Sequence, residues 1–420
     1  METKGHLVCP ACGKKYPEEA AVWQCTCGSC LDLAYTFTPC LAEFKEAFEP
    51  SPSAIVQQNG TTPATAPAPC GQSRFLRYRS VLPLNNPGEA LGFSETATPL
   101  MDTTWEGRPV CLKLEYTLPT GSFKDRGAFL LINKCRELGI KSIVVDSSGN
   151  SACSAAAYSA LAGIEAHIFM PAGNSSGKTR QVSAYGATLY KIPGSRLDTA
   201  RAAEKATATH YYAAHTRNPY FLHGTKTAAY EIMEQLRWQL PEAIFIPVGS
   251  GSLLLGMYLG FTEMKNAGLI DRYPRLMAVQ SDRCSPIDTV LNLMANAAPG
   301  TTISEADIAA ALKPPPAGTV LAEGIANSHP PRLYQIAAAV QHTGGDVLMV
   351  TDQELVEALR KAAARGLYIE PTSATALAAI KHYREMKKDT TGQARGRLVV
   401  MLTGHGLKAG ERIEKILEKA

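Results

Sequence analysis

The segment Gly121-Ser122-Phe123-Lys124-Asp125 places a lysine where a helix is expected to begin. The start of a helix carries a partial positive charge, which lowers the pKa of a nearby lysine unless an anion is close. A neutral amine is a better nucleophile toward an aldehyde than an ammonium ion. Taken alone, Lys124 beside Asp125 and Arg126 would more often belong to a surface ion-pair network. Three further segments change that interpretation.

These three segments are also rich in glycine and hydroxyl groups, and each follows a short apolar run with β-branched residues. They span 146–151, 247–252 and 402–408. In doubly wound α/β folds, ligands bind at the carboxyl ends of strands, where glycines allow close approach and helix starts favour phosphate. Each segment alone is equally typical of a helix cap or a tight turn. Together with Lys124 they predict one ligand site.

From about residue 74 onward, apolar β-branched runs alternate with longer Ala-rich stretches. This alternation indicates βα units that form largely parallel sheets covered by helices. Thr351 and Glu354 form a capping-box pattern ahead of Leu355, which predicts a helix start. We therefore expect an α/β catalytic domain over residues 74–420.

Five cysteines fall within the first 30 residues, four of them in the knuckles Cys9-Pro-Ala-Cys12-Gly13 and Cys25-Thr-Cys27-Gly28. Two close pairs of thiolates match the tetrahedral sulfur coordination of structural Zn²⁺. A module this small has too little apolar core to fold without a stabilising metal site. Residues 1–40 are therefore predicted to form a zinc-ribbon-like module. The second pair can be Cys25 with Cys27 or Cys27 with Cys30. A metal-free tail of free thiols is the alternative.

Composition and charge restrict the function. Residues 41–73 are rich in Pro, Ala and Thr and read as a linker. The net charge of +4 is small and dispersed, so we expect a small-molecule partner and no nucleic acid. No apolar run approaches the roughly 20 residues that cross a bilayer, which predicts no membrane segment. Eleven cysteines without an apolar export signal predict reduced thiols and a cytoplasmic location.

The four segments, in this order, resemble the pyridoxal-phosphate site of the fold-type-II enzymes, the threonine synthases in particular. The shared patterns are of the types GSFKDRGA, SGN before an Ala-rich helix, PVGxG, EP[TS]SA and LTGxGLK, over about residues 74–407. The resemblance implies a tryptophan synthase β-like fold with two open parallel-sheet subdomains, the smaller at roughly 135–230 inserted in the larger. It also implies a homodimer, and the family often carries an N-terminal cysteine ribbon.

The resemblance further implies roles for individual residues. Lys124 would form a Schiff base with pyridoxal 5'-phosphate, Asn150 would contact its phenolic oxygen and Thr403 its pyridine nitrogen. A hydroxyl group at that nitrogen moderates the electron sink, which suits elimination and replacement better than transamination. The cofactor phosphate would lie against Gly249, Ser250, Gly251 and Ser252. The substrate would contact Ser122, Ser148, Ser151 and Lys178. The metal ligands would be Cys9, Cys12, Cys25 and Cys27.

The implied reaction converts O-phospho-L-homoserine and water to L-threonine and phosphate by β,γ-elimination and replacement, with Lys124 as Schiff base and general base. Two departures bear on the substrate. Where many relatives have an arginine and a glutamate, this chain has Phe221 or Leu222 and His223, so an arginine that could clamp a substrate phosphate is missing. The segment 322–326 also differs from the Ala-Ile-Arg-Ile type. We expect His223 to be a core or surface histidine.

Two alternative functions follow from the same residues. One is β-elimination or β-replacement on serine, phosphoserine or threonine, as in a dehydratase. The other is a catalytically idle binding or regulatory protein in which the cysteine module is the working part. The presence of Lys124, Asn150 and Thr403 favours an enzyme over this second alternative.

Overall fold

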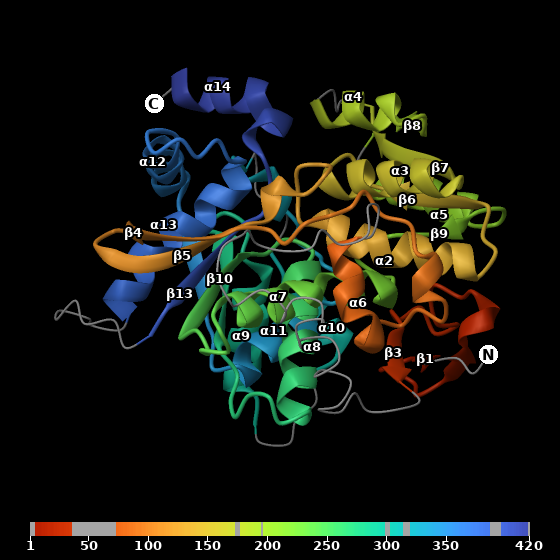
Figure 1. The fold of residues 1–420 in the computed structure, drawn as a ribbon, viewed down its shortest axis with the longest axis horizontal. Helices are drawn as coiled ribbons and strands as arrows, with labels where there is room; N and C mark the ends of the chain where they lie inside the picture. The colour runs from red at the N-terminus through yellow and green to blue at the C-terminus, as the bar shows by residue number, and fades with distance from the viewer. Residues whose placement is uncertain are drawn as a thin grey trace, which may run out of the picture.

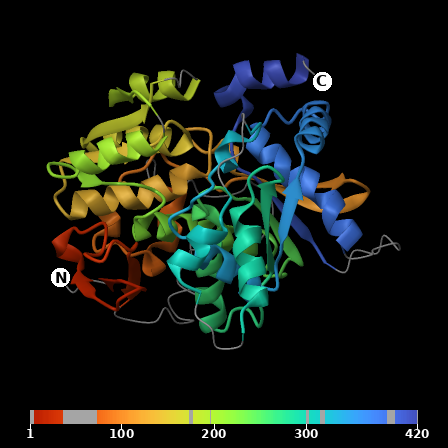
Figure 2. The same ribbon diagram turned by 180° about the vertical axis from the view of Figure 1, so that it is seen from behind.

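A computed structural model describes residues 5–35, 73–172, 177–194, 196–298, 303–313, 320–386 and 396–418. Two sheets of unequal size, each with helices around it, and a small N-terminal module make up the ribbon (Figures 1 and 2). The predicted linker at 41–73 lies outside the described residues except for Ser73, as do the ends of the predicted module, 1–4 and 36–40.

The larger sheet has six strands in the order β12-β11-β10-β13-β5-β4 within the described residues. Neighbouring strands are parallel except β4, which pairs antiparallel with β5 at one edge. The strands are β4 (Leu100–Trp105), β5 (Arg108–Leu114), β10 (Ala243–Pro247), β11 (Arg275–Ser281), β12 (Val347–Val350) and β13 (Leu398–Leu402). The α/β architecture with largely parallel sheets is therefore confirmed.

Both faces of the larger sheet are buried, which explains why its strands read as continuous apolar runs. Along β10, Ile244 and Ile246 join one apolar core while Phe245 joins another, because successive side chains point to opposite faces. The first core includes side chains of α7 (Thr227–Gln235), α8 (Ser252–Asn266), α9 (Pro286–Asn296) and α11 (Leu333–His342). The second includes side chains of α12 (Asp352–Ala363), α13 (Pro371–Met386) and α14 (Gly410–Glu418).

The smaller sheet has four parallel strands in the order β8-β7-β6-β9 within the described residues. They are β6 (Ser142–Asp146), β7 (Glu165–Pro171), β8 (Thr188–Ile192) and β9 (Tyr211–Tyr212). Its helices are α3 (Asn150–Ala162), α4 (Gly177–Ala184) and α5 (Arg196–Ala206). All of these lie inside the range 135–230, although the boundaries of that subdomain stay a prediction.

The lysine of the first segment begins α2 (Lys124–Glu137), whose first turn also carries a buried ion-pair network. The Arg126 guanidinium donates to Glu115 and Glu231 at 2.7 and 2.8 Å, and all three side chains are fully or almost fully buried. Such a network fixes the start of the helix because each charge has partners. The predicted capping box of Thr351 and Glu354 is confirmed at the start of α12.

Two further helices are α6 (Pro219–Thr225) and α10 (Glu305–Ala311), and the short 3-10 helices include η1 (Glu18–Ala20), η3 (Arg74–Val81), η4 (Pro87–Glu89), η5 (Glu115–Thr117), η6 (Glu323–Ile325) and η7 (Gly406–Ala409). Within the described residues, no helix combines the length and the apolar character needed to cross a bilayer.

The N-terminal module is a three-stranded antiparallel sheet of β1 (Gly5–Val8), β2 (Lys15–Pro17) and β3 (Asp32–Tyr35), in the order β2-β1-β3. It docks beside α2 (Figure 1). Glu18 pairs with Lys134 of α2 at 2.8 Å, and both side chains are 1% exposed. Asp32 pairs with Arg332 at 2.5 Å, and the Tyr35 hydroxyl accepts from Lys226 at 2.6 Å. The module is thus held by charged and polar contacts with the catalytic domain.

Candidate active site

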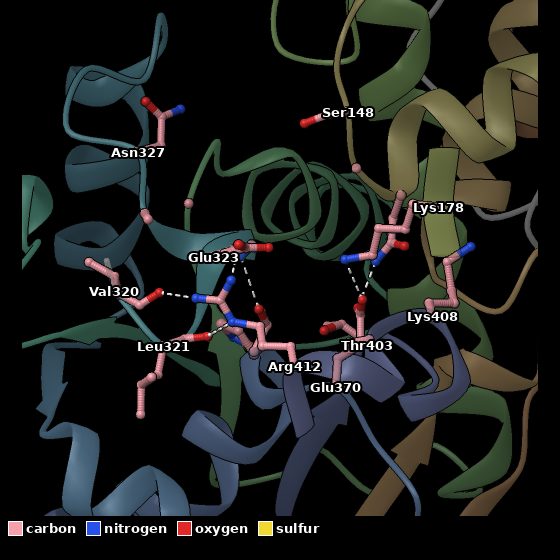
Figure 3. Close-up of a pocket in the computed structure, with 18 of the residues that line it drawn as sticks. Ser148, Lys178, Val320, Leu321, Glu323, Asn327, Glu370, Thr403, Lys408 and Arg412 are labelled. Atoms are coloured by element: carbon pink, nitrogen blue, oxygen red, sulfur yellow. Dashed lines mark hydrogen bonds and ion pairs between the residues drawn. The ribbon is translucent and has the colours of Figure 1, made fainter. Parts of the chain in front are cut away.

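A cavity of about 1480 Å³ opens between the two sheets, lined by residues from both (Figure 3). All four segments predicted from the sequence reach it. The predicted residues that line it are Lys124, Ser148, Asn150, Ser151, Lys178, Gly249, Ser250, Gly251, Ser252 and Thr403. Ser122 is fully buried and is not part of this lining.

Lys124 is the first residue of α2, and its side chain is largely buried. Its Nζ donates to the Ser252 hydroxyl at 3.0 Å and lies 4.6 Å and 5.5 Å from the ring centres of Phe123 and Phe221. Burial, and then the positive charge of Arg196, lower the pKa of Lys124 to about 7. The sequence predicted a lowered pKa for Lys124, attributed to the positive end of the helix dipole. In the structure, the main causes are burial and the charge of Arg196. A large fraction of this amine is therefore neutral near pH 7.

The turn from β10 into α8 forms a cradle that requires glycine. A Cβ atom at Gly249 would lie 2.5 Å from the carbonyl oxygen of Gly324, which is backbone and cannot easily move. Gly251 has φ +77°, and a Cβ there would overlap the Ile336 side chain. Ser252 follows as the first residue of α8. A tight glycine turn leading into a helix start has backbone amides free to bind a phosphate.

A polar cluster of the cavity wall lies at the starts of α3 and α13. The Asn150 amide donates to the Glu370 carboxylate at 2.7 Å, and Lys178 pairs with the same carboxylate at 2.6 Å (Figure 3). Asn150 Oδ1 is buried without a hydrogen-bond partner in the described structure. Because buried polar atoms are nearly always paired, such an atom marks a place where a ligand group is expected.

Thr403 directly follows the carboxyl end of β13, a strand in the central part of the larger sheet. Its hydroxyl lies 3.3 Å from the Ser373 hydroxyl of α13, and Ser373 also accepts from the Gly404 amide at 3.0 Å. These contacts fix the Thr403 side chain at the cavity wall. A hydroxyl there can donate to or accept from a ligand nitrogen without adding a charge.

The predicted substrate-contacting serines differ in their surroundings. The Ser151 hydroxyl donates to Ser147 at 2.9 Å, on the loop that also carries Ser148. Ser122 Oγ is buried with no hydrogen-bond partner among the described residues. Residues 147–151 thus offer several hydroxyl groups to the cavity.

Several polar residues of the cavity wall were not assigned a role from the sequence. They include Arg196, the first residue of α5, His215, which follows β9, and Glu370, which precedes α13. Glu370 belongs to the EP[TS]SA pattern, so the sequence showed a glutamate at this place but did not indicate its role. His215 Nε2 lies 3.1 Å from the Ser250 hydroxyl, and burial, followed by the charges of Lys124 and Arg196, holds the pKa of His215 well below its usual range. A neutral imidazole is expected there.

His223 is buried and lies away from the cavity lining. Its Nδ1 is 2.8 Å from the Tyr35 hydroxyl of the N-terminal module, so it is a core histidine, as expected. Phe221 stands at one of the two positions where many relatives have an arginine. Its side chain is buried against Gly127 and lies beside Lys124.

The residues present fit pyridoxal phosphate. A lysine with a lowered pKa faces a glycine cradle at a helix start, which suits an aldehyde and a phosphate on one ligand. The unpartnered Asn150 Oδ1 and the Thr403 hydroxyl supply polar contacts on the remaining walls. Lys124, Asn150, Thr403 and the 249–252 turn are therefore the residues that would hold the cofactor.

The four cysteines Cys9, Cys12, Cys25 and Cys27 bring their sulfur atoms within 4.8 Å of one another. The Sγ atoms of Cys9 and Cys27, and those of Cys12 and Cys25, lie 3.5 Å apart. Tetrahedral Zn²⁺ with Zn–S bonds of about 2.3 Å separates its sulfurs by about 3.8 Å. The group could hold a metal ion, and Cys30 is not part of it.

The fold and the site define the class of protein. A family model described as pyridoxal-phosphate dependent enzyme matches residues 93–404, and the chain belongs to that family.

The relatives narrow this class to the threonine synthases, to which the chain also belongs. It is 30% identical to a threonine synthase of Methanocaldococcus jannaschii over 413 residues, covering 95% of this chain and 92% of that protein. It is 28% identical to one of Methanosarcina acetivorans, covering 99% and 95%, and 32% identical to one of Synechocystis sp., covering 86% and 91%.

Solved structures agree on the fold. Maize serine racemase superposes with a TM-score of 0.63 at 21% identity, covering 77% of this chain and 92% of that one. A fungal L-serine ammonia-lyase from Rhizomucor miehei gives a TM-score of 0.65 at 20% identity, covering 77% and 98%. At these identities the likeness concerns the fold alone, and it confirms the fold-type-II architecture.

Proposed function

We propose that this enzyme converts O-phospho-L-homoserine and water to L-threonine and phosphate. The observation that carries the proposal is the Lys124 amine, with its lowered pKa, 3.0 Å from the hydroxyl of Ser252 at the start of α8. Relatives named threonine synthase over nearly the whole chain support the same reaction. The atoms balance, since the phosphate ester leaves with its bridging oxygen and water supplies the new hydroxyl group.

Lys124 carries the proton transfers in this proposal. When bound, pyridoxal phosphate supplies an electron sink for the carbanion at the substrate α-carbon. The Lys124 amine takes the α-proton, passes it on and then takes a β-proton, and the phosphate leaves from the γ-carbon. The γ-carbon is protonated to a methyl group, water adds at the β-carbon, and a proton returns to the α-carbon. An amine with a pKa near 7 is suited to both accepting and returning a proton at neutral pH.

The remaining predicted residues have binding roles in this proposal. The 249–252 turn would hold the cofactor phosphate, Asn150 would face the phenolic oxygen and Thr403 the pyridine nitrogen. Ser122, Ser148, Ser151 and Lys178 stay proposed substrate contacts. Lys178 would act together with Glu370, whose carboxylate neutralises it at 2.6 Å.

The test is an assay of phosphate and L-threonine release from O-phospho-L-homoserine by the purified, cofactor-loaded protein. We expect both products in equal amounts, and a loss of at least about 10³-fold in Lys124→Ala, in line with the removal of a general base. Circular dichroism of Lys124→Ala should match the wild type. Full activity of that variant, or no phosphate release by the wild type, would contradict the proposal.

A second candidate is β-elimination or β-replacement on serine, phosphoserine or threonine. The apolar Phe221 beside Lys124, at a position where the family pattern has an arginine, favours a substrate that needs no arginine at that place. Formation of pyruvate or 2-oxobutyrate, without turnover of O-phospho-L-homoserine, would select this candidate.

For the N-terminal module we propose a structural Zn²⁺ held by Cys9, Cys12, Cys25 and Cys27. Four thiolates close the coordination sphere, which leaves no open position for catalysis. We also propose a homodimer, supported by the family resemblance and testable by light scattering. A cytoplasmic location is supported by the described cysteines, which form no disulfide.

A further inference from the structure

One wall of the cavity is formed by loops at the carboxyl ends of the smaller sheet. The loop after β6 carries Ser148, α4 after β7 carries Lys178, α5 after β8 begins with Arg196, and His215 follows β9. Because the four strands are parallel, these side chains reach the cavity from one edge of the sheet.

The position of Arg196 follows from the packing of α5. This helix packs against β6 and β7 as well as β8, and its Ala203 lies in one apolar core with Val144 and Phe169. Its first residue lies close enough to the end of β6 for its charge to act on Asp146 there. The charge of Arg196 contributes to the lowered pKa of Lys124 and of His215. It also acts on Asp146, where it opposes the burial that raises the pKa of that carboxyl group.

Several other basic side chains of the cavity wall already have partners. Lys178 pairs with Glu370 at 2.6 Å, and Arg180 pairs with Glu411 at 3.2 Å. Lys408 donates to the Thr120 carbonyl and the Gln181 side chain, both at 2.5 Å. Arg412 pairs with Glu323 (Figure 3).

Arg196 differs from these side chains. It is exposed at the cavity, and the described part of the chain gives it no ion pair or hydrogen bond. A guanidinium whose five donors have no partner among the described residues is a site at which an anion gains charge-assisted hydrogen bonds.

We propose that Arg196 binds the anionic group of the substrate side chain and so replaces the arginine that is absent at 221–222. This inference rests on the proposed function, since it assigns a substrate class to the same site. The class is an amino acid whose side chain carries a phosphate monoester. The planar guanidinium matches a phosphate with two parallel hydrogen bonds. The hydroxyls of Ser147 and Ser148, on the loop after β6, and of Ser151, in the first turn of α3, belong to the same wall.

Binding by the cofactor-loaded protein tests this inference with ligands other than O-phospho-L-homoserine. Calorimetry would compare inorganic phosphate, O-phospho-L-serine and L-glutamate as ligands of the wild type, Arg196→Gln, Arg196→Lys and Arg201→Gln. The control Arg201 lies on the same helix, is 66% exposed and does not line the cavity. Loading with cofactor keeps the 249–252 turn from serving as the phosphate site.

We expect Arg196→Gln to weaken both phosphate ligands by at least about tenfold, which is the worth of one charge-assisted hydrogen bond. Arg196→Lys should retain part of the affinity, and Arg201→Gln should stay within about twofold of wild type. Equal phosphate affinities in the wild type and Arg196→Gln would overturn the inference. So would an equal loss in Arg201→Gln, or a wild type that binds L-glutamate more tightly than O-phospho-L-serine.

The two proposals fail in different ways. If the protein releases phosphate from O-phospho-L-homoserine while Arg196→Gln keeps the same KM and phosphate affinity, the role of Arg196 is wrong and the reaction stands. If no phosphate is released but Arg196→Gln loses O-phospho-L-serine binding, the reaction is wrong and the role of Arg196 stands.

Discussion

The amine nitrogen of Lys124 lies 3.0 Å from the hydroxyl oxygen of Ser252. Each of the two residues is the first of its helix, so the starts of α2 and α8 meet at the cavity. Both side chains are buried, and helices hold a site more firmly than loops do. The distance between the nucleophilic amine and the glycine cradle is therefore set by the packing of two helices.

The lowered pKa of Lys124 predicts how cofactor uptake depends on pH. The group is charged below its pKa of about 7 and neutral above it, so uptake of pyridoxal phosphate by the cofactor-free protein should speed up as pH rises through 7. The uptake rate should level off above about pH 8. With an ordinary lysine, the rate would keep rising toward the usual lysine pKa near 10.5. Stopped-flow absorbance measures this rate.

The same experiment has a matched pair of variants. Arg196→Gln removes a charge that lowers the Lys124 pKa, so its midpoint should move to higher pH, while Arg201→Gln should leave the midpoint in place. A wild-type rate that rises steadily to pH 10 would contradict the lowered pKa.

Gly249→Ala should weaken cofactor binding strongly. The new methyl group would meet the Gly324 carbonyl oxygen at 2.5 Å, so the turn must shift away from its present position. We expect at least about a tenfold loss of cofactor affinity, or about 1.4 kcal/mol, measured by fluorescence titration. Gly88→Ala is the control, because a Cβ there meets nothing within 4 Å. Unchanged affinity in Gly249→Ala would mean that this turn does not hold the phosphate.

Metal analysis distinguishes the two possible cysteine pairs. Zinc-loaded protein should contain about one Zn²⁺ per chain, and Cys27→Ser or Cys12→Ser should lose it. Cys30→Ser should keep it, because Cys30 lies outside the group of sulfurs within 4.8 Å of one another. Loss of zinc in Cys30→Ser with retention in Cys25→Ser would support the other pairing.

The buried pair of Glu18 and Lys134 predicts that the N-terminal module stabilises the catalytic domain. Glu18→Gln removes one charge of a pair whose side chains are both 1% exposed. It should lower the free energy of unfolding by about 3 kcal/mol, although the 3.2 Å contact of Lys134 with Glu137 reduces the loss. Urea denaturation measures it. The exposed neighbour Glu19, changed to Gln, should shift stability by less than about 0.5 kcal/mol.

The sequence predicted the alternating α/β architecture because buried strands and Ala-rich helices leave clear local patterns. Lys124, Asn150, Thr403 and the 249–252 turn were found because each stands in a glycine- or hydroxyl-rich segment next to a strand. Those segments have turn chemistry that is visible without a structure.

Arg196 and His215 could not be found in this way. Each is a single residue without a distinctive local pattern, and each reaches the cavity only because parallel strands end at one edge of the smaller sheet. The cause of the Lys124 pKa was missed for the same reason, since burial and the charge of Arg196 depend on tertiary packing. The choice of Cys25 over Cys30 as the partner of Cys27 likewise depends on how the chain folds back, not on spacing.

The central claim is that Lys124 holds the cofactor, and borohydride reduction of the cofactor-loaded protein followed by peptide mapping tests it most directly. The account predicts one pyridoxyl group per chain, attached to Lys124 in the peptide that contains Ser122 and Phe123. A pyridoxyl group on any other lysine, or no attachment at all, would contradict it.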